Sequence, residues 1–170
     1  PGDFRRPRDI PPYRTNTMPH YKKITGTRCY LSPLSHEDAA AHTAWENDLT
    51  VGIPLGDEAY TPTSLERMHE QIEGALRNQS HVFSIVALDS EQTIGRCMLT
   101  NLDAINRSAM MGIMIGPEFQ NQGYGQESIR LLLDYAFNLL NLNSVMLGTY
   151  SFNQRALAAY KKVGFQEIGR

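Results

Sequence analysis

A run rich in turn residues passes directly into a run with helical periodicity in the stretch GPEFQNQGYGQESIRLLLDYAF, residues 116–137. Its apolar side chains recur at the spacing of one helix face: Ile129, Leu132, Leu133, Ala136, Phe137 and Leu140. This stripe predicts a helix over 125–140 that packs against a sheet. Gly123 and Gly125 would let backbone N–H groups point outward together beside the positive end of that helix. The junction is therefore predicted to suit a phosphate group.

The rest of the chain alternates between strand and helix patterns. Period-two alternation before the glycine-rich run predicts three strands joined by tight turns, which is an antiparallel meander. Two capping-box signals, Ser35 with Asp38 and Thr63 with Glu66, mark helix starts. The predicted order, typical of an α/β fold, is strand 28–33, helix 35–47, loop 51–62, helix 63–78, strands 81–88, 93–102 and 108–115, helix 125–140, strand 144–150, helix 154–163 and a last strand begun at Phe165.

The length of 170 residues, 41% of them hydrophobic, predicts a single domain. Residues 1–17 are rich in Pro and Arg and are predicted to be a flexible leader or an expression remnant, with a basic arm for an acidic partner as the alternative. The folded domain is then 18–170. The net charge of −2 does not favour nucleic-acid binding.

The cysteines and the hydropathy of the chain indicate the kind of environment in which the protein works. Cys29 and Cys97 are far apart and belong to no metal-ligand motif, so we expect no metal site and a reduced, cytoplasmic environment. No run approaches the roughly eighteen apolar residues of a membrane span, so no membrane association is expected.

Two common phosphate sites fit the glycine-rich junction poorly. A Walker loop needs Gly-Lys-Ser/Thr, yet no Lys or Arg lies between Pro117 and Glu127. A dinucleotide fingerprint needs an acidic residue about twenty positions further on, and none occurs between Asp134 and Glu167. A nicotinamide or flavin enzyme, which would show cofactor absorbance, is therefore a weaker hypothesis.

A third phosphate site matches better. QNQGYG, residues 120–125, resembles the Gln/Arg-x-x-Gly-x-Gly/Ala pyrophosphate loop of the GNAT superfamily of acyl-CoA N-acyltransferases, and NQRALAAYKKVGF, residues 153–165, is similar to its second signature. The chain is most similar to the branch with ribosomal-protein N-terminal and polyamine acetyltransferases, from about Thr27 onward. The resemblance implies a mixed, mostly antiparallel central sheet with a splayed strand pair and helices on both faces.

The resemblance also implies where acetyl-CoA would bind. In the family the strand before the loop bulges and splays from the next strand, and the pantetheine arm lies in the gap, so Ile113 and Ile115 would offer backbone groups. The pyrophosphate would lie on the amides of Gln122, Gly123, Gly125 and Gln126, with Gln120 and Asn121 at the mouth of the loop. The alternative is a plain connection whose glycines serve geometry alone.

Two residues of the second signature are candidates for chemistry. Asn153 and Tyr160 are seven residues apart, so both side chains emerge on one helix face. Asn153 resembles the family residue that hydrogen-bonds the pantetheine arm, and Tyr160 resembles the phenol that protonates the departing thiolate. The alternative for Tyr160 is a core tyrosine. Gly164 is predicted to end this helix.

The implied activity is transfer of an acetyl group from acetyl-CoA to a primary amine by direct attack on the thioester. The loop over 51–62 is predicted to face the cofactor, and its carboxylates Asp57 and Glu58 favour a protein N-terminus or a small cationic amine as acceptor. A non-catalytic acyl-CoA-binding module is the alternative.

The chain departs from its relatives at two points. Met110 stands where many members of the branch carry Glu, so the usual base is missing, and His81, Asp103 and Glu118 are weak substitutes. The family normally adds a strand after the one expected at Phe165, whereas this sequence stops at Arg170. A neighbouring chain in a homodimer is one way to supply that strand.

Overall fold

A single sheet of six strands organises the chain, of which this computed structural model describes residues 20–169. The strands follow the order of the sequence; each pairs antiparallel with the next up to β5, and β6 pairs parallel with β5. The predicted meander, β3 to β5, is confirmed. The strands are β1 Ile24–Thr25, β2 Cys29–Pro33, β3 His81–Ala87, β4 Thr93–Asp103, β5 Ser108–Ile115 and β6 Ser144–Met146.

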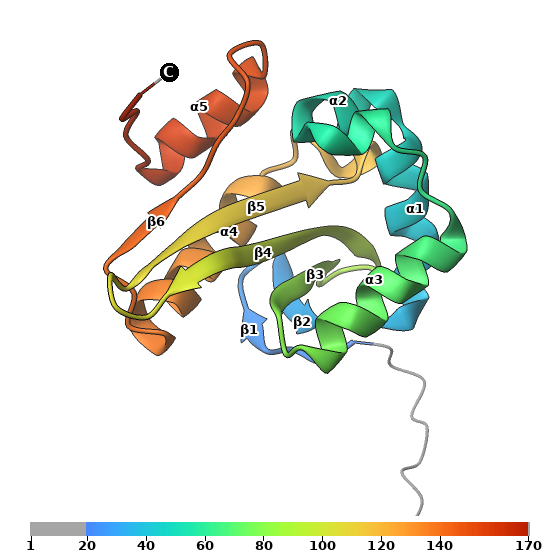
Figure 1. The fold of residues 1–170 in the computed structure, drawn as a ribbon, viewed down its shortest axis with the longest axis horizontal. Coiled ribbons are helices and arrows are strands. Elements are labelled where there is room, and N and C mark those ends of the chain that lie inside the picture. Colours follow the sequence, from blue (N-terminus) through green and yellow to red (C-terminus); the bar gives the residue numbers. More distant parts are fainter. Residues whose placement is uncertain (1–19, 170) are drawn as a thin grey trace, which may run out of the picture.

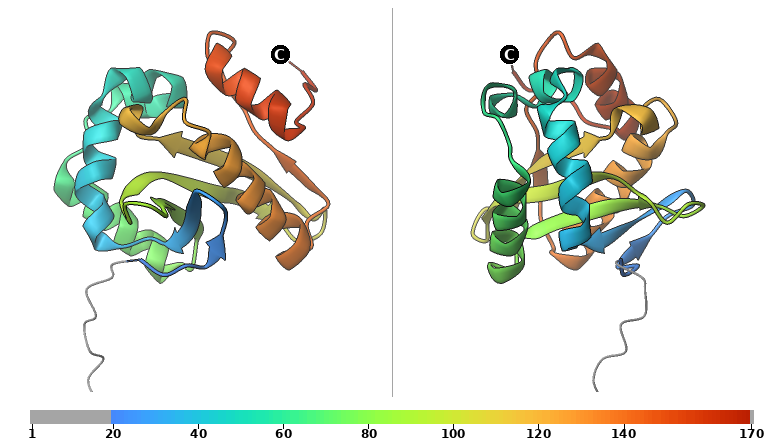
Figure 2. Two further views of the ribbon diagram at one scale, coloured as in Figure 1. Left: turned by 180° about the vertical axis from the view of Figure 1, so that it is seen from behind. Right: turned by 90° about the vertical axis from the view of Figure 1, so that its right-hand side faces the viewer.

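Helices lie on both faces of this sheet, as predicted. Figures 1 and 2 show α1 and α3 on one face and α4 across the opposite face. The last helix, α5, packs against α4 beside β6. The helix bounds are α1 Ala39–Asn47, α2 Leu49–Leu55, α3 Leu65–Arg77, α4 Tyr124–Asp134 and α5 Gln154–Val163.

The main core lies between the sheet and α4. Ile129, Leu132 and Ala136 of the predicted stripe are at most 1% exposed and pack with buried residues of β2 to β5. Phe137 was expected on the same face but is 40% exposed. The helix continues through Tyr135–Leu139 as a π-helical turn, and the extra residue in such a turn changes the direction of the side chains that follow.

A short helix, α2, occupies part of the predicted loop over 51–62, which is a correction. The Asp48 carboxylate caps its first turn, and Val51 is buried against Trp45. Pro54 lies inside this helix, and Pro disfavours helix formation in an isolated segment. Burial of one face of α2 outweighs this local preference.

Other element bounds also differ from the sequence pattern. The α3 cap is Ser64, whose hydroxyl accepts a hydrogen bond from the Arg67 N–H, rather than Thr63. The strand β6 ends at Met146, earlier than expected, and residues 165–169 contain no strand after Phe165. The β1 strand was not predicted. Ser35 and Asp38 form the predicted capping box, although the first turn is a 3-10 turn.

Candidate active site

A cavity opens where β5 and β6 separate. The two strands pair only from Ser108 to Met110 on β5, opposite 144–146 on β6. Beyond this point, residues 111–115 of β5 and the segment after β6 line a cavity of about 720 Å³. The expectation of a splayed strand pair is confirmed.

The splay arises without the expected bulge in β5. Pairing of β5 with β4 runs in unbroken register from Met110 opposite Thr100 to Ile115 opposite Gly95, and the irregularity lies instead in β4, between Thr100 and Asp103. A strand offers hydrogen-bonding groups to both sides. Past Met110, the β5 groups that face away from β4 therefore border the cavity, including those of the stretch that contains Ile113 and Ile115.

The start of α4 forms one end of this cavity. Gly123 precedes the helix with a φ of 88°, in the left-handed region that favours glycine, and no side chain caps the helix there. The first N–H groups of α4 thus present the positive end of the helix without a side-chain acceptor. Such a helix start is able to bind an anion, and binding of a phosphate group there stays a prediction.

Most of the predicted loop residues reach the cavity. The Gln120 side chain folds back, and its Nε2 donates to the Ile115 carbonyl at 2.9 Å. Gln122 does not line the cavity, because its side chain turns away and donates to the Glu118 carbonyl at 2.8 Å. The loop and helix residues that do line it are Gln120, Asn121, Gly123, Gly125 and Gln126.

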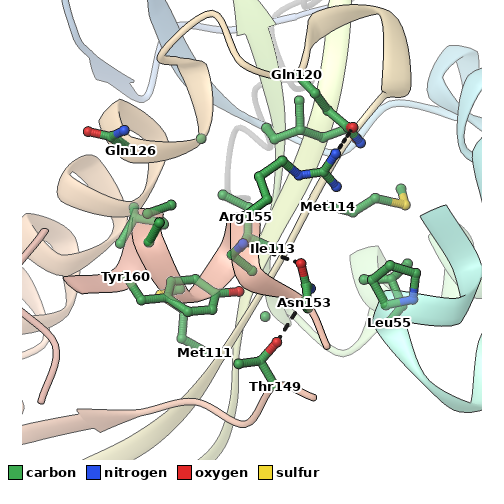
Figure 3. A pocket seen from close by; sticks show the side chains of 18 of the residues that line it. Leu55, Met111, Ile113, Met114, Gln120, Gln126, Thr149, Asn153, Arg155 and Tyr160 are labelled. Carbon is green, nitrogen blue, oxygen red and sulfur yellow. Dashed lines mark hydrogen bonds between the residues drawn. The ribbon is translucent and has the colours of Figure 1, made fainter. Parts of the chain in front are cut away.

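The helix α5 forms a second wall of the cavity. Asn153 caps this helix, because its Oδ1 accepts from the Ala156 N–H at 3.2 Å, and its Nδ2 donates to Thr149 Oγ1 at 3.4 Å (Figure 3). Tyr160 lines the cavity from the same helix, with its ring edge-to-face against Phe165. Burial raises the pKa of Tyr160 above its ordinary 10.0. The phenol therefore keeps its proton at neutral pH and is able to donate it.

The helix α5 also brings positive charge to the cavity. The sequence analysis did not identify the two side chains that carry this charge. Arg155 and Lys162 both line the cavity. Arg155 Nη1 donates to Gln120 Oε1 and links α5 to the loop before α4, as Figure 3 shows. The two cations are seven residues apart, so the spacing argument applied to Asn153 and Tyr160 could have found them.

A further wall of the cavity is formed by α2. Val51, Pro54 and Leu55 line it, so part of the predicted loop does form a wall. Asp57 and Glu58 belong to the 3-10 turn that follows, but their side chains lie outside the described part of the structure.

None of the three substitute bases lies at the cavity. The His81 Nδ1 pairs with the Tyr135 hydroxyl at 2.8 Å in another part of the fold, and Glu118 is exposed. Asp103 accepts hydrogen bonds in the turn after β4, and the bonds from Asn106 lower the pKa of its carboxyl. Among the residues whose side chains the structure describes, 20–56 and 59–169, none that lines the cavity is Asp, Glu or His.

Two further properties concern residues 20–169 as a whole. No group of three or more His, Cys, Asp or Glu side chains in this part of the chain is placed to hold a metal ion. No helix there is long and apolar enough to cross a membrane. Cys29 and Cys97 are both buried and unpaired.

Comparison with known proteins agrees with this geometry. Residues 28–166 match the acetyltransferase (GNAT) domain family. Spermidine N(1)-acetyltransferase from Escherichia coli K12 is 28% identical over 139 residues, which cover 82% of this chain and 73% of that protein. The crystal structure of spermidine N-acetyltransferase from Vibrio cholerae with CoA and spermine has a TM-score of 0.73 at 25% identity, covering 85% of this chain and 84% of that one. A GNAT-family acetyltransferase from Bacillus anthracis shares the fold, with a TM-score of 0.77 at 16% identity over 86% of this chain and 84% of its own.

Proposed function

Because this chain belongs to the GNAT acetyltransferase family and transfers acetyl groups from acetyl-CoA to an amine, we propose that its acceptor is a cationic primary amine, either a small molecule or a protein N-terminus. One observation carries the assignment of the site. The cavity between the splayed strands extends from the uncapped start of α4 to Tyr160 and to α2. A single space thus offers an anion site, an acid and a separate wall for an acceptor.

In this proposal one set of cavity residues binds the cofactor, and another set assists the reaction. The backbone amides of Gly123, Gly125 and Gln126, three residues that line the cavity, hold the pyrophosphate, and the free edge of β5 at Ile113 and Ile115 holds the pantetheine arm. Asn153 has a second amide hydrogen left for the same arm, because its Nδ2 makes one hydrogen bond among the described residues. Acetyl-CoA supplies the activated thioester.

The chain's own groups then assist a direct transfer. The neutral amine attacks the thioester carbonyl, a C–N bond forms, and the C–S bond breaks. A backbone N–H on β5 stabilises the oxyanion, and Tyr160 donates its proton to the departing thiolate. The proton that the amine loses passes to water.

The preference for a cationic acceptor rests on two supports. Asp57 and Glu58 follow directly after α2, whose residues form the wall opposite α5. In addition, the matched relatives from Escherichia coli and Vibrio cholerae are named for spermidine. A cytoplasmic location and a homodimer remain predictions.

A transfer assay with a panel of amines tests this proposal. Release of free CoA thiol is measured with a polyamine, a neutral amino-acid amide and an acidic amine at equal concentrations. We expect the cationic amine to give the highest kcat/KM, and the double variant Asp57→Asn, Glu58→Gln to lower that value selectively, with Glu70→Gln on the exposed face of α3 as the control.

Other outcomes have distinct meanings. Preference for the acidic amine, or an unchanged kcat/KM in the double variant, would contradict the acceptor assignment. Tight binding of acetyl-CoA with no thiol release from any amine would instead favour the non-catalytic binding module.

A further inference from the structure

The turn between β1 and β2 is hydrogen-bonded to the first turn of α4. Glu127 Oε1 accepts hydrogen bonds from the Thr27 N–H, from Thr27 Oγ1 at 3.0 Å and from the Arg28 N–H at 3.0 Å. Three donors from two adjacent residues thus converge on one carboxylate oxygen. These partners are about a hundred residues apart in the sequence, so the contact joins the edge of the sheet to the start of α4.

The same turn is shaped to admit this carboxylate. A Cβ atom added at Gly26 would collide with Glu127 Oε1. Gly26 does not need a left-handed conformation, so its lack of a side chain serves the close approach of Glu127. The carboxylate oxygen therefore packs directly against the backbone of the turn, on an exposed part of the molecule.

Arg28 extends from this turn to the loop that precedes α4. Its Nη1 donates to the Gln122 carbonyl at 2.7 Å. A trans peptide places its N–H opposite its carbonyl, and the structure contains no cis peptide bond among the described residues. Arg28 therefore holds the 122–123 peptide with the Gly123 N–H directed away from the turn, and Gly123 lines the cavity.

We propose that Arg28 and Glu127 are positioning residues that fix the amide of Gly123 for the cofactor diphosphate, with Glu127 anchoring the turn that carries Arg28. Neither side chain lines the cavity, so both act through the loop rather than on the cofactor. Orienting a donor in advance removes the cost of ordering it on binding. This inference rests on the proposed function, in which the start of α4 binds the diphosphate.

Whether replacing Glu127 weakens or strengthens binding of acetyl-CoA distinguishes a positioning role from a purely electrostatic one. Removing the negative charge of Glu127 close to an anion site would, by charge alone, strengthen binding of acetyl-CoA. Loss of the anchor predicts weaker binding. We therefore expect Glu127→Met, which removes both the charge and the acceptor oxygens, and also Gly26→Ala, which displaces the carboxylate sterically, to raise the KM for acetyl-CoA.

The test compares two acetyl donors in steady-state assays with one amine. S-acetylpantetheine lacks the nucleotide diphosphate and needs no fixed Gly123 amide. For Arg28→Met we expect the KM for acetyl-CoA to rise about ten- to a hundredfold, the scale of one charge-assisted hydrogen bond, with kcat and the use of S-acetylpantetheine nearly unchanged. Arg28→Lys should recover part of the loss, and Arg130→Met, exposed on the same helix, is the control.

Each outcome separates the inference from its premise. If the wild-type protein uses acetyl-CoA no better than S-acetylpantetheine, the diphosphate site itself is wrong. If it prefers acetyl-CoA, but Arg28→Met and Glu127→Met keep the wild-type KM, the positioning role is refuted while the proposed function stands. Equal losses with both donors indicate a general structural effect, which also overturns the inference.

Discussion

Replacing Asp38 with Asn should destabilise the protein in a pH-dependent way. Asp38 is 1% exposed, and His20 Nε2 donates to its Oδ1 at 2.8 Å. Thr93 and Ser84 donate through their hydroxyls, and the Ser35 N–H donates at 2.8 Å. The carboxylate thereby joins the start of the first helical segment to β3 and β4. The substitution keeps the size of the side chain but removes its charge.

The magnitude follows from the pKa of Asp38. Burial alone would raise this pKa, but hydrogen bonds from His20, Ser84, Thr93 and the Ser35 backbone outweigh burial and lower it from 3.8 to about 2. At about 1.4 kcal/mol per pKa unit, the ionised carboxylate contributes about 2 to 2.5 kcal/mol to the free energy of unfolding. This contribution is complete above the unfolded-state pKa and is lost as the pH falls through the folded-state pKa.

Urea unfolding at several pH values measures this contribution. We expect the free energy of unfolding of Asp38→Asn to lie about 2 to 3 kcal/mol below that of the wild type at pH 7. The difference should shrink by about 2 kcal/mol between pH 5 and pH 2, because protonation removes the same charge in the wild type. Asp89→Asn, exposed in the turn after β3, is the control. A difference that does not change with pH would refute an ionised Asp38.

Two further predictions concern the cavity. Tyr160→Phe should lower kcat about ten- to a thousandfold with little change in the KM for acetyl-CoA. Since burial raises the pKa of Tyr160, deprotonation of this phenol should cause no loss of the wild-type rate below pH 10. An intact kcat in a folded variant would assign Tyr160 to packing. Gly123→Asp should abolish most of the acetyl-CoA affinity in calorimetry, because the site gains a negative charge and a side chain at a φ of 88°; unchanged affinity would contradict the diphosphate site.

The regular elements were largely predictable from the sequence. The spacing of apolar side chains predicted α4, α5 and the β3 to β5 meander, because which side chains share one face is a property of the local sequence. The glycine-rich run and the second signature likewise located Gly123, Asn153 and Tyr160, which do lie around one cavity. Their chemical roles stay predictions that the variants above address.

The features that the sequence did not predict depend on contacts between segments far apart in the chain. Arg28 contacts Gln122 across 94 residues, and Arg155 contacts Gln120 across 35, so no short pattern contains either pair. The helix α2 forms despite its Pro and Gly because Val51 is buried against Trp45 and Met114 in the folded protein. Periodicity depends on neighbouring residues, and the sequence alone could therefore determine most of the longer helices and strands and where the glycine-rich loop begins. The contacts that orient this loop depend on how β1, β2 and α5 pack around α4, which only the tertiary structure determines.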